Sequence, residues 1–240
     1  MSVSSTAQSL KALKRELRRG VMDKLGKLSQ DVIMQQSTTV KNHICSSEVY
    51  NKSNRISLYL SMQHAELNTD ELARQIIKDG RRISKGLNTH SLTLLQGKKL
   101  FVPFIHQNEV PTMTMLNIKS LEQLRALKRN KWGIPEVEQG DYAQYEQALA
   151  NECPGLDLIL TPAVAFDKSF NRLGHGKGFY DRYIKAASAH AEVYAMHPPT
   201  VIGLALKEQI LDTDRVPTGP LDEVMDAIVT SDGFEWCREG

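Results

Sequence analysis

The sequence predicts an α/β protein with three layers, in which helices cover both faces of a mostly parallel, Rossmann-like central sheet. Apolar runs of strand length, at 55–62, 158–160 and 200–206, are separated by segments with helical periodicity. A polar loop and then a helix follow the first run, and this strand–loop–helix order is the building block of parallel sheets. In such sheets ligands gather beyond the carboxyl ends of the strands, so the loops after the apolar runs are the first place to look for a site.

Composition favours a globular protein without a strong electrostatic partner. The 240 residues carry 41% hydrophobic and 24% charged side chains and a formal net charge of +2. This balance gives no argument for nucleic acid or for a membrane surface, and no apolar run approaches the ~20 residues of a membrane-spanning helix. No repeat or linker divides the chain, so we expect a single domain over 1–240 that is a monomer or a weak dimer.

The cysteines and histidines predict neither disulfides nor a bound transition metal. Cys45, Cys153 and Cys237 are odd in number and far apart, which fits a reducing compartment. The N-terminus has no apolar segment of the kind that directs secretion. We expect a cytoplasmic protein; the serines and threonines before a basic helix leave an additional mitochondrial pool open.

The N-terminal region predicts two helices. Leucines recur at helical spacing over 9–28, and Lys14 and Arg18, four residues apart, project from one side of that helix. Such a basic face is either solvated or turned toward an anion. Ser29 has the character of an N-cap for a second helix over 30–46.

The next segments predict the first strand and its neighbours. Apolar residues alternate over 55–62, and Thr69 is a candidate cap for a helix over 70–78 that we expect to end at Gly80. Glu66, in the loop between them, is either a solvated charge or a ligand-binding acid. Residues 81–96 show no regular spacing of apolar side chains, which predicts an exposed insertion.

The middle of the chain is less regular. Strands are predicted over 98–105, where Pro103 indicates an edge strand or a strand end, and near 113–116, with a short helix over 120–127. Trp132 lies among turn residues, where it either walls a pocket for a flat ligand or packs partly buried. Residues 141–151 are polar and helical at most. Later apolar runs predict strands over 200–206 and 227–230, with a helical turn over 207–211.

A glycine-rich turn after the run 158–160 is the strongest local signal. Gly174, Gly176 and Gly178 alternate with His175 and Lys177 before a predicted helix over 179–187. A turn between strand and helix aims unpaired N–H groups and the positive end of the helix dipole at one spot, which suits a phosphate. The spacing matches neither a Walker A loop nor a dinucleotide fingerprint, and a flexible turn is the alternative.

The longer string around this turn is more specific. Pro162, Phe166-Asp167, Arg172-Leu173-Gly174 and the residues up to Asp181 resemble the signature of the 5-formyltetrahydrofolate cyclo-ligase family, also called 5,10-methenyltetrahydrofolate synthetases. Four further segments resemble family elements in the same order, so that the likeness runs from Lys14 to about Ser231; they are 14–18, 55–62, 132–136 and 204–209. The resemblance implies a fold like that of sugar-phosphate isomerases and CoA transferases.

The resemblance also implies an activity. Family members use ATP and Mg²⁺ to convert 5-formyltetrahydrofolate into 5,10-methenyltetrahydrofolate, with release of ADP and phosphate. The formyl oxygen attacks the γ-phosphoryl group, and N10 then captures the activated carbon. The protein must position the groups and neutralise negative charge that spreads over the phosphoryl oxygens.

The residue roles that the resemblance implies fall into four groups. Catalytic roles fall to Lys177 and Arg172. The residues assigned to ATP are Lys14, Arg18, Arg172, Leu173, Gly174, His175, Gly176, Lys177, Gly178, Phe179 and Tyr180. The residues assigned to the folate are Leu60, Glu66, Trp132, His175, Gly176, Lys177, Gly178 and Phe179. Asp181 would ligate Mg²⁺, and Asp222 is the nearest candidate for a second metal acid.

The sequence departs from the family pattern at five places. Phe179 stands where relatives often have tyrosine, one extra residue precedes Glu66, residues 81–96 have no counterpart, Phe104-Ile105 replace basic residues, and a second family acid near the C-terminus has no clean match. Phe179 and the unmatched acid support the first of two alternatives to an active ligase. One is a module that binds folate or nucleotide without turnover, and the other is an unrelated isomerase or transferase that shares the sheet topology.

Overall fold

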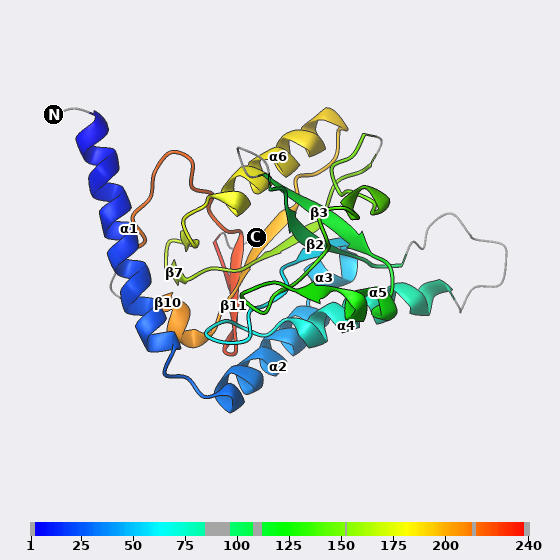
Figure 1. Cartoon of the computed structure of the whole chain (residues 1–240), viewed down its shortest axis with the longest axis horizontal. Coiled ribbons are helices and arrows are strands. Elements are labelled where there is room, and N and C mark those ends of the chain that lie inside the picture. The colour runs from blue at the N-terminus through cyan, green and yellow to red at the C-terminus, as the bar shows by residue number, and fades with distance from the viewer. Residues whose placement is uncertain (1–2, 85–96, 108–111, 152, 213–214, 238–240) are drawn as a thin grey trace.

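The computed structural model describes residues 3–84, 97–107, 112–151, 153–212 and 215–237, and it confirms the predicted three-layer α/β class (Figure 1). The central sheet has seven strands in the order β12-β11-β9-β6-β1-β2-β3. Its members are β1 (Arg55–Leu58), β2 (Lys99–Ile105), β3 (Met113–Ile118), β6 (Leu158–Thr161), β9 (Thr200–Leu204), β11 (Ala227–Thr230) and β12 (Gly233–Trp236). The five inner strands run parallel, and β3 and β12 pair antiparallel at the two edges.

Helices cover both faces of this sheet. The helix α6 (Phe179–Val193) lies over one face, whereas α2 (Gln30–Ser46), α3 (Glu48–Lys52) and α4 (Asp70–Ser84) lie over the other (Figure 1). The long helix α1 (Val3–Leu25) stands apart from these layers and contacts the turn after β9. Of these helices, none in the described part of the chain is both long and apolar enough to span a membrane.

Smaller elements complete the fold. A second sheet has the strand order β10-β7-β8, and a two-stranded ribbon pairs β4 with β5. The remaining elements are β4 (Lys128–Arg129), β5 (Pro135–Glu136), β7 (Ala165–Asp167), β8 (Arg172–Leu173), β10 (Ile210–Leu211), α5 (Leu121–Ala126) and the 3₁₀ turns η1 (Tyr142–Gln144) and η2 (Lys207–Gln209).

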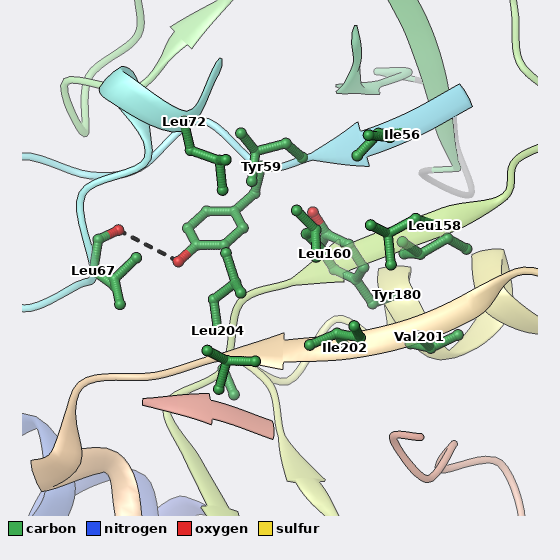
Figure 2. Packing of buried hydrophobic residues seen from close by; sticks show 14 of the residues in the cluster. Ile56, Tyr59, Leu67, Leu72, Leu158, Leu160, Tyr180, Val201, Ile202 and Leu204 are labelled. Carbon is green, nitrogen blue, oxygen red and sulfur yellow. Dashed lines mark hydrogen bonds between the residues drawn. The ribbon is translucent and has the colours of Figure 1, made fainter. Parts of the chain in front are cut away.

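The core explains why the inner strands read as continuous apolar runs. All four residues of β1 and all four of β6 are buried, because helices cover the sheet on both sides. Ile56 pairs with Leu158 on one side and with Leu100 on the other. Figure 2 shows Tyr59 and Tyr180 among the leucines and isoleucines of β1, β6 and β9.

Two predicted boundaries are wrong, namely the end of the strand β1 and the end of the helix α4. The strand β1 ends at Leu58, and α4 continues through Gly80 to Ser84. A Cβ atom on Gly80 would lie 2.2 Å from the Lys98 carbonyl oxygen, so this glycine permits close packing instead of ending the helix.

The Thr69 hydroxyl donates to the Tyr59 carbonyl, 2.7 Å away, and accepts from the Ser61 amide, which ties the loop after β1 together. Of the predicted insertion, 81–84 is helical and 85–96 lies outside the described residues.

Other predictions were confirmed or refined. Ser29 caps α2 through a hydrogen bond from the Val32 amide. Pro103 lies in β2, which is not an edge strand. The pairing of β1 with β2 ends at Phe101, two residues before this proline. Beyond that point β3 is the only strand among the described residues that pairs with β2, so the missing proline N–H breaks no bond to β1. In the predicted helix over 141–151 only η1 is helical, and the 3₁₀ turn of 207–211 passes into β10.

Candidate functional site

The site lies at the point in the sheet where the chain stops adding strands on one side and begins to add them on the other. From β1 the chain passes through α4 to β2 on one side, and from β6 it passes through α6 to β9 on the other. The carboxyl ends of β1 and β6 therefore form a topological switch point, the place where open α/β sheets bind ligands. The loop that carries Glu66 follows β1, and the glycine-rich turn follows β6 after the β7–β8 hairpin.

The hairpin before the glycine-rich turn is held by Asp167. Its carboxylate accepts hydrogen bonds from the amides of Ser169 and Asn171 at 2.9 and 3.0 Å, and from the Val216 amide at 2.9 Å. Asp167 is 1% exposed, so it organises the hairpin and is closed to ligands. Sequence reasoning gave it no role, although an aspartate followed by Ser and Asn at positions two and four is a turn signature.

Two glycines of the turn need their residue type. Gly176 and Gly178 have φ of 98° and 63°, in the left-handed region that other residues rarely adopt. Gly178 is also the N-cap of α6 and offers no side chain to the first turn of that helix. The unpaired N–H groups at this end thus stay open toward the turn, as an anion site requires.

The basic face of α1 meets this turn. The Arg18 Nε donates a 2.7 Å hydrogen bond to the Gly174 carbonyl, and a Cβ atom on Gly176 would lie 3.4 Å from the Arg18 guanidinium carbon. Lys14 forms a 2.5 Å ion pair with Asp222. The solvated-face alternative is therefore wrong for these two cations, whereas Arg19 on the same helix is exposed.

Arg172 and Asp181 form a buried ion pair beneath the turn. The Arg172 Nη2 lies 2.9 Å from the Asp181 Oδ1, and the two side chains are 4% and 12% exposed. Arg172 also donates to the Pro162 carbonyl and lies 5.5 Å from the centre of the Tyr180 ring. Its buried Nε has no partner among the described residues. In this state Arg172 supports the turn from below.

Lys177 and His175 occupy the exposed tip of the turn. Lys177 forms no hydrogen bond or ion pair with any residue that the structure describes, which leaves its ammonium group available to an anion. Loss of hydration next to protein atoms, together with the charges of Arg18 and Arg172, lowers the pKa of His175. The imidazole is therefore biased toward its neutral form.

Glu66 is a buried acid with one neutral donor. It is 7% exposed, and its Oε2 accepts a 2.8 Å hydrogen bond from the Met62 amide. Burial raises the pKa of Glu66 to about 7, against the opposing effect of that hydrogen bond. The buried Tyr59 and Tyr180 lie close enough for the Glu66 charge to help raise their own pKa values. The solvated-charge alternative for Glu66 is therefore wrong.

Other residues predicted to contact ligands differ in accessibility. Trp132 is 62% exposed, so the partly buried alternative is wrong, and Lys131 lies 4.4 Å above its ring. A Cβ on Gly133 would lie 3.1 Å from the Gln63 side chain, which places the tryptophan segment against the loop after β1. Leu60 is 5% exposed.

Leu173 and Tyr180, which were predicted to contact ATP, are buried, whereas Phe179 is half-buried. The Tyr180 ring belongs to the core, and its hydroxyl has no hydrogen-bond partner among the described residues (Figure 2). Its contact with a nucleotide stays a prediction.

The two predicted metal acids are neutralised by the predicted phosphate-binding cations. Asp181 pairs with Arg172 and Asp222 with Lys14, and the Glu223 amide reaches the Asp181 carboxylate at 3.4 Å. The described residues contain no group of three or more side chains that could hold a metal by itself. Mg²⁺ commonly takes one or two carboxylates and completes its shell with phosphate oxygens and water, so this donor set fits Mg²⁺ that arrives with a polyphosphate.

Taken alone, the fold and the site define an α/β protein with cations and a glycine-rich helix N-terminus at the switch point of its sheet and a buried acid beside them. Comparison with known proteins then identifies the family. The model of the 5-formyltetrahydrofolate cyclo-ligase family matches residues 10–85 and 84–231. A mouse 5-formyltetrahydrofolate cyclo-ligase is 33% identical over 226 residues, which are 94% of this chain and 97% of the mouse protein. A yeast (Saccharomyces cerevisiae) protein of the same name is 29% identical and covers 95% of this chain and 100% of its own.

A solved structure agrees with the sequence relatives. The Aquifex aeolicus 5,10-methenyltetrahydrofolate synthetase superposes with a TM-score of 0.67 at 26% identity, over 95% of this chain and 94% of that one. The chain therefore belongs to the 5-formyltetrahydrofolate cyclo-ligase family, and the protein is a ligase.

Proposed function

We propose that the protein converts 5-formyltetrahydrofolate into 5,10-methenyltetrahydrofolate with ATP and Mg²⁺, releasing ADP and phosphate. The observation that carries this proposal is the meeting of α1 with the glycine-rich turn: the Arg18 Nε lies 2.7 Å from the Gly174 carbonyl. Cations that are far apart in the sequence thus gather at one proposed anion site. Glu66, from the loop after the neighbouring strand β1, supplies a second recognition group at the same switch point.

The anion site suits the triphosphate of ATP. Lys14 and Arg18 bind phosphate oxygens from α1, and the amides of Gly176 and Gly178 do so from the turn. Lys177, which has no partner among the described residues, neutralises the transferred γ-phosphoryl group. Because phosphoryl transfer spreads charge over oxygens and needs little covalent chemistry from the protein, fixed cations and amides are the contribution expected of it.

Arg172 has a different role in this scheme. Its guanidinium is 4% exposed and paired with Asp181, so in the nucleotide-free protein it positions the turn from beneath. Asp181 and Asp222 would hold Mg²⁺ together with the phosphate oxygens. When bound, Mg²⁺ neutralises charge on the β- and γ-phosphoryl oxygens.

The acid Glu66 suits the pterin. A buried carboxylate can accept hydrogen bonds from the N–H edge of the pterin, and ligand N–H donors would favour its ionised form, which burial alone disfavours. Leu60 lies in the same loop, and the exposed Trp132 offers an aromatic face next to it. His175 to Phe179 border both substrates.

The reaction then has two steps. The formyl oxygen attacks the γ-phosphorus, the bond to the β-phosphate oxygen breaks, and ADP leaves. N10 next attacks the activated formyl carbon, loses its proton, and expels phosphate with the former formyl oxygen. Phosphorylation is required because an amide-type oxygen is a poor leaving group.

The test follows the absorbance of methenyltetrahydrofolate formed from 5-formyltetrahydrofolate, with ATP and Mg²⁺ added together and each omitted in turn. Turnover only in the complete mixture, with one ADP formed per product, supports the proposal. Saturable folate binding without product under all three conditions contradicts it and favours a binding module.

A further inference from the structure

The loop after β1 passes from the surface into the interior over a few residues. Gln63 and His64 are exposed, whereas Glu66 is buried. The far end of the loop is fixed to the core, because the Tyr59 hydroxyl donates a 3.3 Å hydrogen bond to the Leu67 carbonyl (Figure 2). The position of the Glu66 carboxylate therefore depends on what holds the exposed stretch before it.

The backbone is strained immediately before Glu66. Ala65 has a φ of 59°, in the left-handed region that a residue with a Cβ atom rarely adopts. Such a conformation persists only where surrounding contacts fix it. One of these contacts lies within the loop, where the Met62 amide donates to the Glu66 carboxylate at 2.8 Å. A relaxed Ala65 would redirect the residue that follows it, so a contact from outside the loop is needed to keep the acid in place.

The helix α2 supplies this outside contact. The side-chain amide of Gln30, the first residue of α2, donates to the Gln63 carbonyl at 3.1 Å and to the Nδ1 atom of His64 at 2.6 Å. We call these two hydrogen bonds the Gln30 clasp. Ser37, two turns further along the same face of α2, accepts a 2.9 Å hydrogen bond from the Asn68 amide. The helix thus holds the loop on both sides of its buried acid.

Gln63 is also the residue at which the tryptophan segment meets this loop. A Cβ atom on Gly133 would lie 3.1 Å from the Gln63 side chain, so the turn that carries Trp132 packs on the residue that Gln30 holds. An acid and an aromatic face that bind one flat ligand must keep a fixed separation, which their supporting contacts have to maintain. The Gln30 clasp lies at the junction of both segments.

We infer that Gln30 is a positioning residue for folate binding, which holds the loop of Glu66 and the turn of Trp132 in the arrangement that the pterin requires. The inference rests on the proposed function. Gln30 acts through the loop and donates nothing to the phosphate site, so its loss should weaken the affinity for folate and leave the phosphoryl chemistry unchanged.

The test uses two variants and a matched control. Gln30→Ala removes the whole side chain, and Gln30→Met keeps its length but has no N–H group to donate. The control is Gln35→Ala on the same helix, because Gln35 is exposed and its side chain forms no hydrogen bond with any residue that the structure describes. Ser29 remains the N-cap and both new residues favour helix, so α2 should stay intact.

Three measurements separate the steps of the inference. Hydrogen exchange with mass spectrometry follows the amides of residues 60–68, and calorimetry measures binding of 5-formyltetrahydrofolate without ATP. The absorbance assay gives kcat and the KM values for folate and ATP. In both Gln30 variants we expect exchange to be about 10-fold faster and the folate Kd and KM to rise about fivefold, with kcat and the KM for ATP within about twofold of wild type. Gln35→Ala should match wild type throughout.

Unchanged exchange in Gln30→Ala would overturn the clasp, and faster exchange with unchanged folate affinity would overturn its role in positioning. Wild-type affinity in Gln30→Met would overturn it as well, because packing alone would then suffice. Failure of the proposed function gives a different result. If the wild type binds folate without turnover and both Gln30 variants still bind it more weakly, the clasp stands and the proposed reaction is refuted.

Discussion

Glu66 makes the stability of the fold depend on pH, and this prediction can be worked out from the structure. Glu66 is 7% exposed, and among the described residues it has one neutral donor, the Met62 amide at 2.8 Å. Burial raises the pKa of Glu66 from 4.5 to about 7. The native protein therefore holds a proton at Glu66 under conditions where the unfolded chain has released it.

The sign of the effect follows from this proton. The contribution of protonated Glu66 to the unfolding free energy is fully present below pH 4.5. It is lost as the pH rises through the folded pKa of about 7. A difference of about 2.5 pKa units corresponds to about 3 kcal/mol of unfolding free energy. The loss is spread over the window from about pH 4.5 to 7 and then levels off.

The perturbation is Glu66→Gln, which keeps the shape and the acceptor for the Met62 amide but removes the titration. Urea denaturation of wild type and variant is followed by far-UV circular dichroism at intervals from pH 5 to pH 8.5. The advantage of the variant in unfolding free energy should be small near pH 5 and should reach about 3 kcal/mol above pH 7.5.

A difference between the two proteins that stays constant across this range would refute the reasoning, because it would mean that Glu66 is ionised throughout. The same variant has a functional consequence. If the carboxylate accepts the pterin N–H groups, Glu66→Gln should raise the KM for folate much more than it lowers kcat. An unchanged folate dependence would show that another acid binds the pterin.

Three further substitutions test the phosphate site. Lys177→Ala should lower kcat by about 10²–10³-fold without changing the thermal unfolding midpoint, and wild-type rates would remove this lysine from the mechanism. Arg18→Ala should raise the KM for ATP about 10-fold and leave that for folate unchanged, whereas the exposed Arg19→Ala should change neither; equal effects would contradict the assigned face of α1. Asp181→Asn should lower the unfolding free energy by about 3 kcal/mol in urea denaturation, because it leaves the buried Arg172 uncompensated, and a loss below 1 kcal/mol would argue against that pair.

Periodicity and motif spacing predicted the framework because they reflect local rules. The runs at 55–58 and 158–161 are buried on both faces, which produces unbroken apolar strings, and Ser29 caps α2 as its type suggests. Gly80 shows where such rules fail. Glycine often ends a helix, but here it admits the Lys98 backbone from a distant segment, and nothing near Gly80 in the sequence reveals that neighbour.

The strand β12 and the small β10-β7-β8 sheet were missed for a related reason. Their strands have only two to four residues, too few to show a period of two against the surrounding irregular sequence.

In the proposed phosphate site, too, local spacing predicted which cations share a helix face but could not predict their distant partners. The four-residue spacing of Lys14 and Arg18 predicted a shared face, and the structure confirms that this face turns inward. The partner of Lys14 is Asp222, which is 208 positions away, and no local pattern could pair them. The resting site is thereby balanced, since both predicted metal acids are paired with cations. In the proposed function, ATP and Mg²⁺ together would bring both signs of charge, so the phosphate oxygens could pair with the cations and Mg²⁺ with the acids. Either ligand alone would separate an existing ion pair and leave one of its two members without a partner.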